Sequence, residues 1–262
     1  MEFFTASLWA ETLKGRRSKV PWLTALGISL APFMGGLFMV ILKDPERARS
    51  MGLITAKAQL TACVADWPTF LSFLVYTVAV GGAMLFALVT AWIFGREFSD
   101  HTVKELLALP ARREVIVSAK FILLALWALG VMVIIFGLHL LVGMWVGLPG
   151  WSPALVWTAA GDLLATTILT LGLMPPVALL ASAGRGYLPP MGWAILTVVL
   201  AQIAGVLGWG AWFPWAVPAS FSGMAGPRAE QIGWYSYFMV AAVCAAGLAG
   251  TYLWWRSADQ TR

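Results

Sequence analysis

The sequence predicts an all-α integral membrane protein, a single transmembrane domain over residues 1–262 with six transmembrane helices. Hydrophobic residues make up 60% of the chain and charged residues only 11%, which is far more apolar than the core of a soluble domain requires. The apolar residues form continuous runs of about the 20 residues that a helix needs to cross a bilayer, not the alternating pattern of a β-barrel. The 15 tryptophans fit the aromatic belts at the two membrane surfaces.

The N-terminal residues 1–19 are expected to form an interfacial helix that lies in the headgroup plane. In a helix Ser7, Glu11 and Lys14 share one polar stripe, and the apolar residues lie away from it. The first span follows at about residues 20–42. Residues 43–66 carry too many charges for a span and predict an outer loop, after which the second span runs over about 67–94.

The polar stretch 95–113 separates the second span from the third and predicts a short amphipathic helix. Thr102 followed by Glu105 has the spacing of an N-terminal capping box, in which the two residues hydrogen-bond the first turn. Pro110 ends the helix because proline has no N–H to donate. Such a helix, with leucines on one side, suits the docking of another protein. The residues we assign to this role are Glu97, Asp100, Thr102, Glu105, Leu106, Leu107, Leu109, Pro110, Arg112 and Arg113.

The remaining spans are predicted at about residues 114–146, 154–183, 188–207 and 234–255. Pro175 and Pro176 fall inside the fourth and should kink it, because two backbone donors are lost. Residues 208–233 begin with an uncharged stretch rich in aromatic residues, proline and glycine. This composition favours a re-entrant hairpin on the outer side, between spans five and six, where irregular backbone at membrane depth can be buried in protein.

The distribution of the positive charges predicts the orientation. With six spans both termini lie on one side, and the segments on that side hold twelve of the 17 lysines and arginines, against five on the other. Positively charged loops stay in the cytoplasm. We therefore expect a multi-pass protein of a bacterial cytoplasmic (inner) membrane, with both termini and the 95–113 segment in the cytoplasm.

Several kinds of chemistry are not indicated by the sequence. No G-x-x-x-x-G-K-[ST] loop is present, so ATP and its Mg²⁺ would have to be bound by a partner chain. The two histidines are too few for a histidine-based metal cluster, and Cys63 and Cys244 imply no disulfide framework. The net charge of +5 is spread over short loops, which does not indicate nucleic-acid binding. No cofactor or metal site is expected in this chain.

A translocation path could include a few polar or aromatic residues of the spans. Asp162 could line such a path or could be a carboxylate satisfied by a hydroxyl or by water near the end of its span. His139 could belong to the path or be a hydrogen-bonded packing residue. The aromatic cluster after the fifth span could gate an outer exit or form part of an interfacial belt. Its members are Trp209, Trp212, Phe213 and Trp215.

The 95–113 segment and its flanks resemble the permease subunits of ABC-2 type transporters, particularly the small six-span bacterial permeases of antibiotic export and immunity systems. The matching residues are Glu97, Thr102, Leu106, Leu107, Pro110, Arg112 or Arg113, Ala119 and Lys120, with His101 where that family commonly has glycine. The resemblance implies a coupling helix at residues 95–113 that docks into an ABC ATPase subunit. It also implies a pair of permease chains, as a homodimer or a heterodimer, embedded in membrane lipid.

The leading hypothesis from the sequence is therefore the membrane-spanning subunit of an ATP-driven exporter without a nucleotide site of its own. Its substrate would be amphipathic, such as a peptide antibiotic, a drug or a lipid. Two alternatives stay open. The chain could be a small secondary carrier or channel that works without ATP, or a non-transporting membrane subunit that anchors another protein.

Overall fold

The computed structural model describes residues 2–44, 64–108, 112–222 and 232–257. Within these ranges six helical stretches are long and apolar enough to cross a membrane, which confirms the predicted number of spans. Their bounds agree closely with those expected from hydropathy. The six are Val20–Lys43, Trp67–Ser99, Arg113–Val146, Pro153–Ala183, Leu188–Leu207 and Trp234–Ser257.

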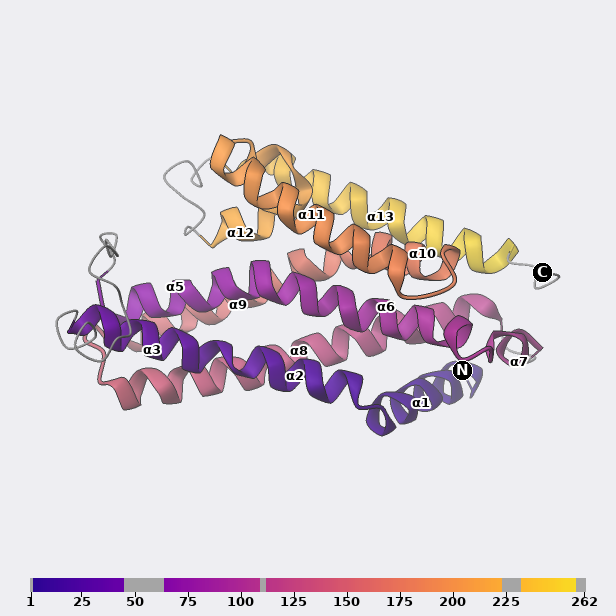
Figure 1. Ribbon diagram of the computed structural model, residues 1–262, viewed down its shortest axis with the longest axis horizontal. Helices are drawn as coiled ribbons and strands as arrows, with labels where there is room; N and C mark the ends of the chain where they lie inside the picture. The colour runs from indigo at the N-terminus through magenta and orange to yellow at the C-terminus, as the bar shows by residue number, and fades with distance from the viewer. Residues whose placement is uncertain (1, 45–63, 109–111, 223–231, 258–262) are drawn as a thin grey trace.

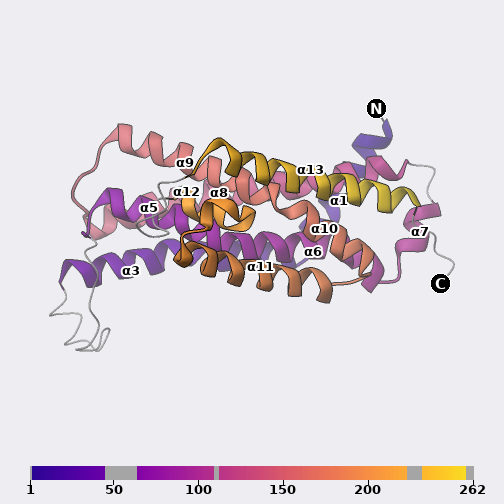
Figure 2. The same cartoon turned by 90° about the horizontal axis from the view of Figure 1, so that it is seen from above.

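The spans run along the long axis of the molecule as one bundle (Figure 1). Both chain ends and the short helix α7 (Val103–Ala108) lie at the same end of the bundle, and a view turned by 90° agrees (Figure 2). An even number of spans requires this arrangement. The α7 end of the bundle is therefore the end that carries most of the chain's lysines and arginines.

Three of the spans are interrupted helices. The first consists of α2 (Val20–Ser29) and α3 (Ala31–Lys43), and the fourth of α9 (Pro153–Gly172) and α10 (Met174–Ala183). Proline lies in the first turn of both α3 and α10 and cannot donate to the preceding turn, so each break falls just before it. The second span passes from α5 (Trp67–Thr77) through a π-helical turn, Val78–Gly82, into α6 (Ala83–Ser99).

The second span ends later than the sequence predicts. Helix α6 continues to Ser99, five residues beyond the expected end at residue 94. Glu97 therefore lies in α6 and is buried. A charged residue usually indicates the end of a span because an unpaired charge is costly inside a membrane. Glu97 is paired with lysines of two other helices, as described below, so the helix can continue past it.

The two segments expected at the membrane surfaces are both packed against the bundle. Helix α1 (Glu2–Arg17) contacts α8 (Arg113–Val146), and its Glu11 is buried. After α11 (Leu188–Leu207) the chain forms two 3₁₀ turns and the short helix α12 (Val217–Phe221), which contacts α9. The headgroup-plane and re-entrant placements stay predictions. Of the 43–66 loop and the 208–233 segment, residues 45–63 and 223–231 lie outside the described residues.

Helix α13 (Trp234–Ser257) packs on α10 most closely at Gly247. A Cβ atom at this position would lie 2.6 Å from the ring Cδ and the backbone nitrogen of Pro176. Backbone atoms cannot move aside as a flexible side chain can. Gly247 thus permits an approach that any other residue would prevent.

We expect Gly247→Ala to lower the free energy of unfolding by about 2 kcal/mol, the usual result of overpacking. Unfolding in mixed micelles, followed by intrinsic fluorescence during titration with a denaturing detergent, would measure this. The control is Gly192→Ala in α11, where a Cβ meets nothing within 4 Å and alanine should be neutral or stabilising. Equal stability of the two variants would contradict the close packing at Gly247.

Candidate functional site

Four charged side chains from three helices meet near the α7 end of the bundle. Lys120 of α8 donates to Glu97 of α6 at 2.8 Å and lies 3.3 Å from Glu11 of α1. Lys14 of α1 reaches the same two carboxylates, Glu11 at 2.7 Å and Glu97 at 3.0 Å. We call Glu11, Lys14, Glu97 and Lys120 the ion network. It joins residues that are up to 109 positions apart in the chain.

Three members of the ion network are buried, Lys14 is partly exposed, and the charges of the four balance. The exposed fraction is 0% for Lys120, 2% for Glu97 and 4% for Glu11. The third donor of Lys120 is used too, because its Nζ also donates to the Ile93 carbonyl at 2.8 Å. Removing charges from water costs several kcal/mol per ion unless they are paired and hydrogen-bonded. The network therefore fixes the positions of α1, α6 and α8 relative to one another.

Lys14 is the most exposed member of the ion network. Its burial alone would lower the pKa of the ammonium group, but Glu11 and Glu97 outweigh that effect and the pKa lies above its ordinary value. A raised lysine pKa contributes stability at every pH below the unfolded value and loses it only as the pH rises through the folded value. The contribution of Lys14 is thus fully present at neutral pH.

The end of α6 leads into the polar segment through a tight turn with a left-handed residue, His101, at φ 57°. The Thr102 N–H donates to the Glu97 carbonyl at 2.9 Å and the His101 N–H to the Phe98 carbonyl at 3.3 Å. These two bonds make the Schellman motif, in which glycine is the usual left-handed residue. The turn forms although this chain has histidine there.

The capping box predicted from Thr102 and Glu105 is not formed. The backbone N–H that Glu105 would accept from is already donated to Glu97. Among the residues that the structure describes, no hydrogen bond links the Thr102 hydroxyl to the first turn of α7 either. The prediction was wrong because the end of α6 uses the same backbone group.

We expect His101→Gly to raise the melting temperature, because glycine adopts positive φ without the strain of about 1 kcal/mol that a side chain brings. Thermal unfolding in detergent would show a rise of several degrees if that strain is present. The matched control is Thr102→Gly, one residue further, where φ is not positive and glycine should lower the melting temperature or leave it unchanged. A His101→Gly chain that melts below the parent chain would refute the strain.

The start of α8, where the chain leaves the polar segment, is fixed to the end of α13. Arg113 donates to the carbonyls of Trp255 and Arg256 at 3.1 and 3.2 Å. Glu114 lies 3.3 Å from Arg256, and the hydroxyls of Ser118 and Tyr252 are 2.8 Å apart. Positive side chains at the C-terminal end of a helix also interact favourably with its dipole. Both helices that flank α7 are therefore attached to other spans.

We call the ion network, together with the contacts that join the start of α8 to the end of α13, the frame around α7. Some of the predicted docking residues belong to this frame and others do not. Glu97 is buried in the ion network and Arg113 is half-buried against α13, so both are placed to hold the frame. Leu106 and Leu107 lie in α7. Leu109 and Pro110 fall outside the described residues. The docking residues with exposed side chains in the described part of the chain are Asp100, Thr102, Glu105 and Arg112.

The two polar candidates for a translocation path have different surroundings. His139 is fully buried, its Nε2 lies 2.8 Å from the Phe70 carbonyl, and its ring stacks on the Phe70 ring at 3.6 Å between centroids. It joins α8 to α5. Asp162 of α9 is half-buried and has neither a hydrogen bond nor an ion pair with another described residue.

The aromatic cluster after α11 divides into an outer and an inner part. Trp209 and Trp212 are about two-thirds exposed. Phe213 is half-buried, and its ring lies 5.6 Å from that of Trp215. Trp215 turns inward and packs edge-on against Trp193 at 5.5 Å.

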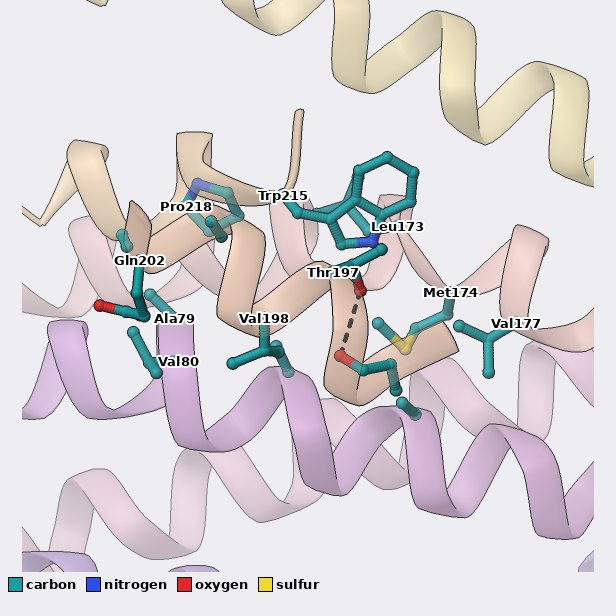
Figure 3. Close-up of a pocket in the computed structure, with 15 residues that line it drawn as sticks. Ala79, Val80, Leu173, Met174, Val177, Thr197, Val198, Gln202, Trp215 and Pro218 are labelled. Atoms are coloured by element: carbon teal, nitrogen blue, oxygen red, sulfur yellow. Dashed lines mark hydrogen bonds between the residues drawn. The ribbon is translucent and has the colours of Figure 1, made fainter. Parts of the chain in front are cut away.

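A small apolar cavity of about 20 Å³ lies beside Trp215, with room for about one water molecule. Figure 3 shows Trp215 and Pro218 at the top, Gln202, Val198 and Thr197 of α11 spread across the middle, and Val80 of the π-helical turn at the lower left. The Thr197 hydroxyl is used within its own helix, where it donates to the Ala194 carbonyl. Only Trp215 of the four aromatic residues lines this cavity.

Sequence reasoning did not bring Glu11, Lys14 and Lys120 together with Glu97. Glu11 and Lys14 were assigned to the polar face of an interfacial helix, and Lys120 entered only as a residue of the family pattern. The available signal was the lysine itself, because a lysine within the long apolar run of the third span needs an anionic partner. The pattern could not say which of the 12 acidic residues supplies it.

Comparisons with known proteins agree on one kind of protein. Residues 7–203 match the sequence family described as "ABC-2 family transporter protein". The bacitracin transport permease protein BCRB of Bacillus licheniformis is 28% identical over 195 residues, which cover 73% of this chain and 91% of the relative. No solved structure gives a significant match. The family match extends from α1 to α11 and so includes all four residues of the ion network.

Proposed function

Since this chain belongs to the ABC-2 transporter family, we propose that it is the permease subunit of an exporter driven by ATP hydrolysis in a separate ATPase chain. The observation that carries the proposal is the frame around α7. This six-residue helix connects α6, which the ion network fixes, to α8, which Arg113 fixes to α13. A force applied to α7 would reach four helices of the bundle.

The α7 end of the bundle is proposed to face the cytoplasm. It carries the positive residues of α1, α6, α7, α8 and the end of α13, whereas Lys43 lies at the opposite end in the described residues. The positive-inside rule then places α7 where a soluble ATPase can bind it. ATP and Mg²⁺ would be bound by that partner.

In the proposed mechanism the ATPase moves α7, and the movement alternates access to a path between this chain and a second permease chain. Rigid transmission is needed, because a flexible joint at Glu97 or Arg113 would absorb the movement. The buried ion network supplies this rigidity at α6. The partner permease could be an identical or a diverged chain.

The proposed substrate is an amphipathic compound. The relative from Bacillus licheniformis is a bacitracin transport permease by name, which makes bacitracin the first compound to test. Asp162 and the outer aromatic residues Trp209 and Trp212 are the candidates for contact with it. An Asp162→Asn chain that exports the compound at the parental rate would remove Asp162 from the site.

The deciding experiment is reconstitution of the full-length chain with and without an ATPase encoded beside it. We expect the tagged chain to copurify with a P-loop ATPase, and proteoliposomes holding both to take up bacitracin only with ATP and Mg²⁺. An ATPase variant without its P-loop lysine is the control. Uptake by the chain alone in an ion gradient would instead indicate a secondary carrier. Copurification without any uptake of bacitracin or other amphipathic compounds would favour a membrane anchor.

A further inference from the structure

Two adjoining depressions lie where α1 meets α2, α6 and α8. One has an apolar lining and a volume of about 310 Å³. The other has a polar lining and about 320 Å³. Trp92 of α6 lines both. The last residues of α1 line both depressions: Gly15 and Arg16 line the apolar one, and Lys14 and Arg17 line the polar one.

The apolar depression is a groove between α2 and α8. Its outer rim is formed by Trp22 of α2 and Leu126 of α8, whose side chains are 64% and 57% exposed. Gly130 of α8 leaves part of the groove open, since a Cβ there would meet nothing within 4 Å. We call it the chain groove, because its size and lining suit part of an extended hydrocarbon chain.

The polar depression is basic. It is lined by Lys14, Arg17 and Arg96 against one acidic residue, Asp100. The charge of Lys14 is balanced within the ion network, so the other three residues give the depression a net charge of +1. Arg96 is held over the Trp92 ring at 5.0 Å. Neither Arg17 nor Arg96 forms an ion pair with another residue that the structure describes. We call it the basic depression.

We propose that the chain groove and the basic depression together bind one anionic phospholipid, with the phosphodiester at Arg17 and Arg96 and an acyl chain over Trp92 along α8. The two guanidinium groups offer the charge-assisted hydrogen bonds that phosphate oxygens accept. The adjoining groove offers the apolar surface that a free anion would not use. The basic surface adjoins the apolar surface in the same way as the headgroup of a lipid adjoins its acyl chains in a leaflet.

This inference goes beyond the proposed function, since it holds for any activity of the chain. Its consequence follows from Lys14, which lines the basic depression and also belongs to the ion network. A lipid phosphate there adds a negative charge beside Lys14 and holds α1 against α6. Bound lipid should therefore stabilise the α7 end of the bundle.

The test uses the purified full-length chain in an uncharged detergent, titrated with phosphatidylglycerol, with phosphatidylcholine of the same acyl chains, or with glycerol 3-phosphate. Melting temperature and native mass spectrometry measure binding. We expect phosphatidylglycerol to bind about tenfold or more tightly than phosphatidylcholine, and glycerol 3-phosphate to give no shift at the same concentration. Each charge near a membrane surface changes affinity by roughly fivefold.

Two pairs of variants distinguish the contribution of the lipid headgroup to binding from that of its acyl chain. Arg17→Gln/Arg96→Gln should weaken phosphatidylglycerol binding by about thirtyfold, whereas Lys104→Gln/Arg112→Gln removes two exposed charges elsewhere and should not. Gly130→Leu should fill the chain groove and weaken both lipids. Gly137→Leu is its control, because Gly137 also lies in α8 with open space around it and does not line the groove.

Four results would overturn the proposal. They are equal binding of the two lipids, equal binding of glycerol 3-phosphate and phosphatidylglycerol, no difference between the two charge variants, and no difference between Gly130→Leu and Gly137→Leu. A fifth would reassign the groove to a second copy of this chain. In that case Gly130→Leu, and not Gly137→Leu, would convert a dimer to a monomer in size-exclusion chromatography without changing lipid binding.

Discussion

Replacing Lys120 with methionine is expected to lower the free energy of unfolding by about 3 to 5 kcal/mol. The substitution keeps the length and the apolar stem of the side chain but removes the charge that contacts Glu97 at 2.8 Å and Glu11 at 3.3 Å. Two buried carboxylates would then share Lys14 alone. An uncompensated charge at a site with 2% exposure cannot be stabilised by water, which is why the loss is large.

A double-mutant cycle shows whether the loss comes from charge imbalance. Glu97→Gln should also destabilise the chain, because it leaves Lys120 with the more distant Glu11. The combination Glu97→Gln/Lys120→Met restores the balance between Glu11 and Lys14, so its loss should be well below the sum of the two. Unfolding in mixed micelles measures all three variants.

The control for this cycle is an exposed ion pair at the same end of the bundle. Glu114 and Arg256 lie 3.3 Å apart with side chains 47% and 65% exposed, and such pairs contribute about 0 to 1 kcal/mol. Glu114→Gln should therefore have little effect. If Lys120→Met proved no worse than Glu114→Gln, the ion network would not be holding α1, α6 and α8 together.

The six spans could be predicted from the sequence because hydropathy and length depend only on neighbours along the chain. Eleven of the twelve ends of these spans fall within two residues of the predicted positions, as at Leu188 and Leu207. The exception is the end of α6, which was predicted at residue 94 and lies at Ser99, so that Glu97 belongs to the helix. Its charge is neutralised by residues from two other helices, and local reasoning cannot supply them.

The candidate site was only half predictable for the same reason. The polar stretch, its short helix and its place between two spans follow from composition, and the structure has α7 there. The ion network does not follow from composition. Glu11 and Lys120 are 109 residues apart, and nothing in the hydropathy pattern says which faces of α1 and α8 meet. The turn at His101 was not expected either. The histidine that replaces the family's glycine argued against a tight turn there, and the structure has the turn nonetheless.

Transport should fall below about a tenth of the parental rate when Leu106 and Leu107 of α7 are both replaced with glutamate. A docking helix contributes binding energy through its buried apolar side chains, and each charge brought into an apolar contact costs several kcal/mol. Copurification of the ATPase should be lost with transport. Membrane insertion and the melting temperature should be unchanged. Helix α7 is only six residues long, and the ion network and Arg113 fix the flanking helices α6 and α8 without it.

The matched control for this variant is Leu106→Met/Leu107→Met, which keeps the apolar character and nearly the volume of both side chains. It should copurify with the ATPase and transport at close to the parental rate. Comparing the glutamate variant with the methionine variant separates the effect of added charge from the effect of any substitution in α7. If the glutamate variant bound the ATPase and transported as well as the methionine variant, α7 would not be the coupling helix. The force would then have to enter the bundle elsewhere, and the exposed face of α1 beside Lys14 would be the next place to test.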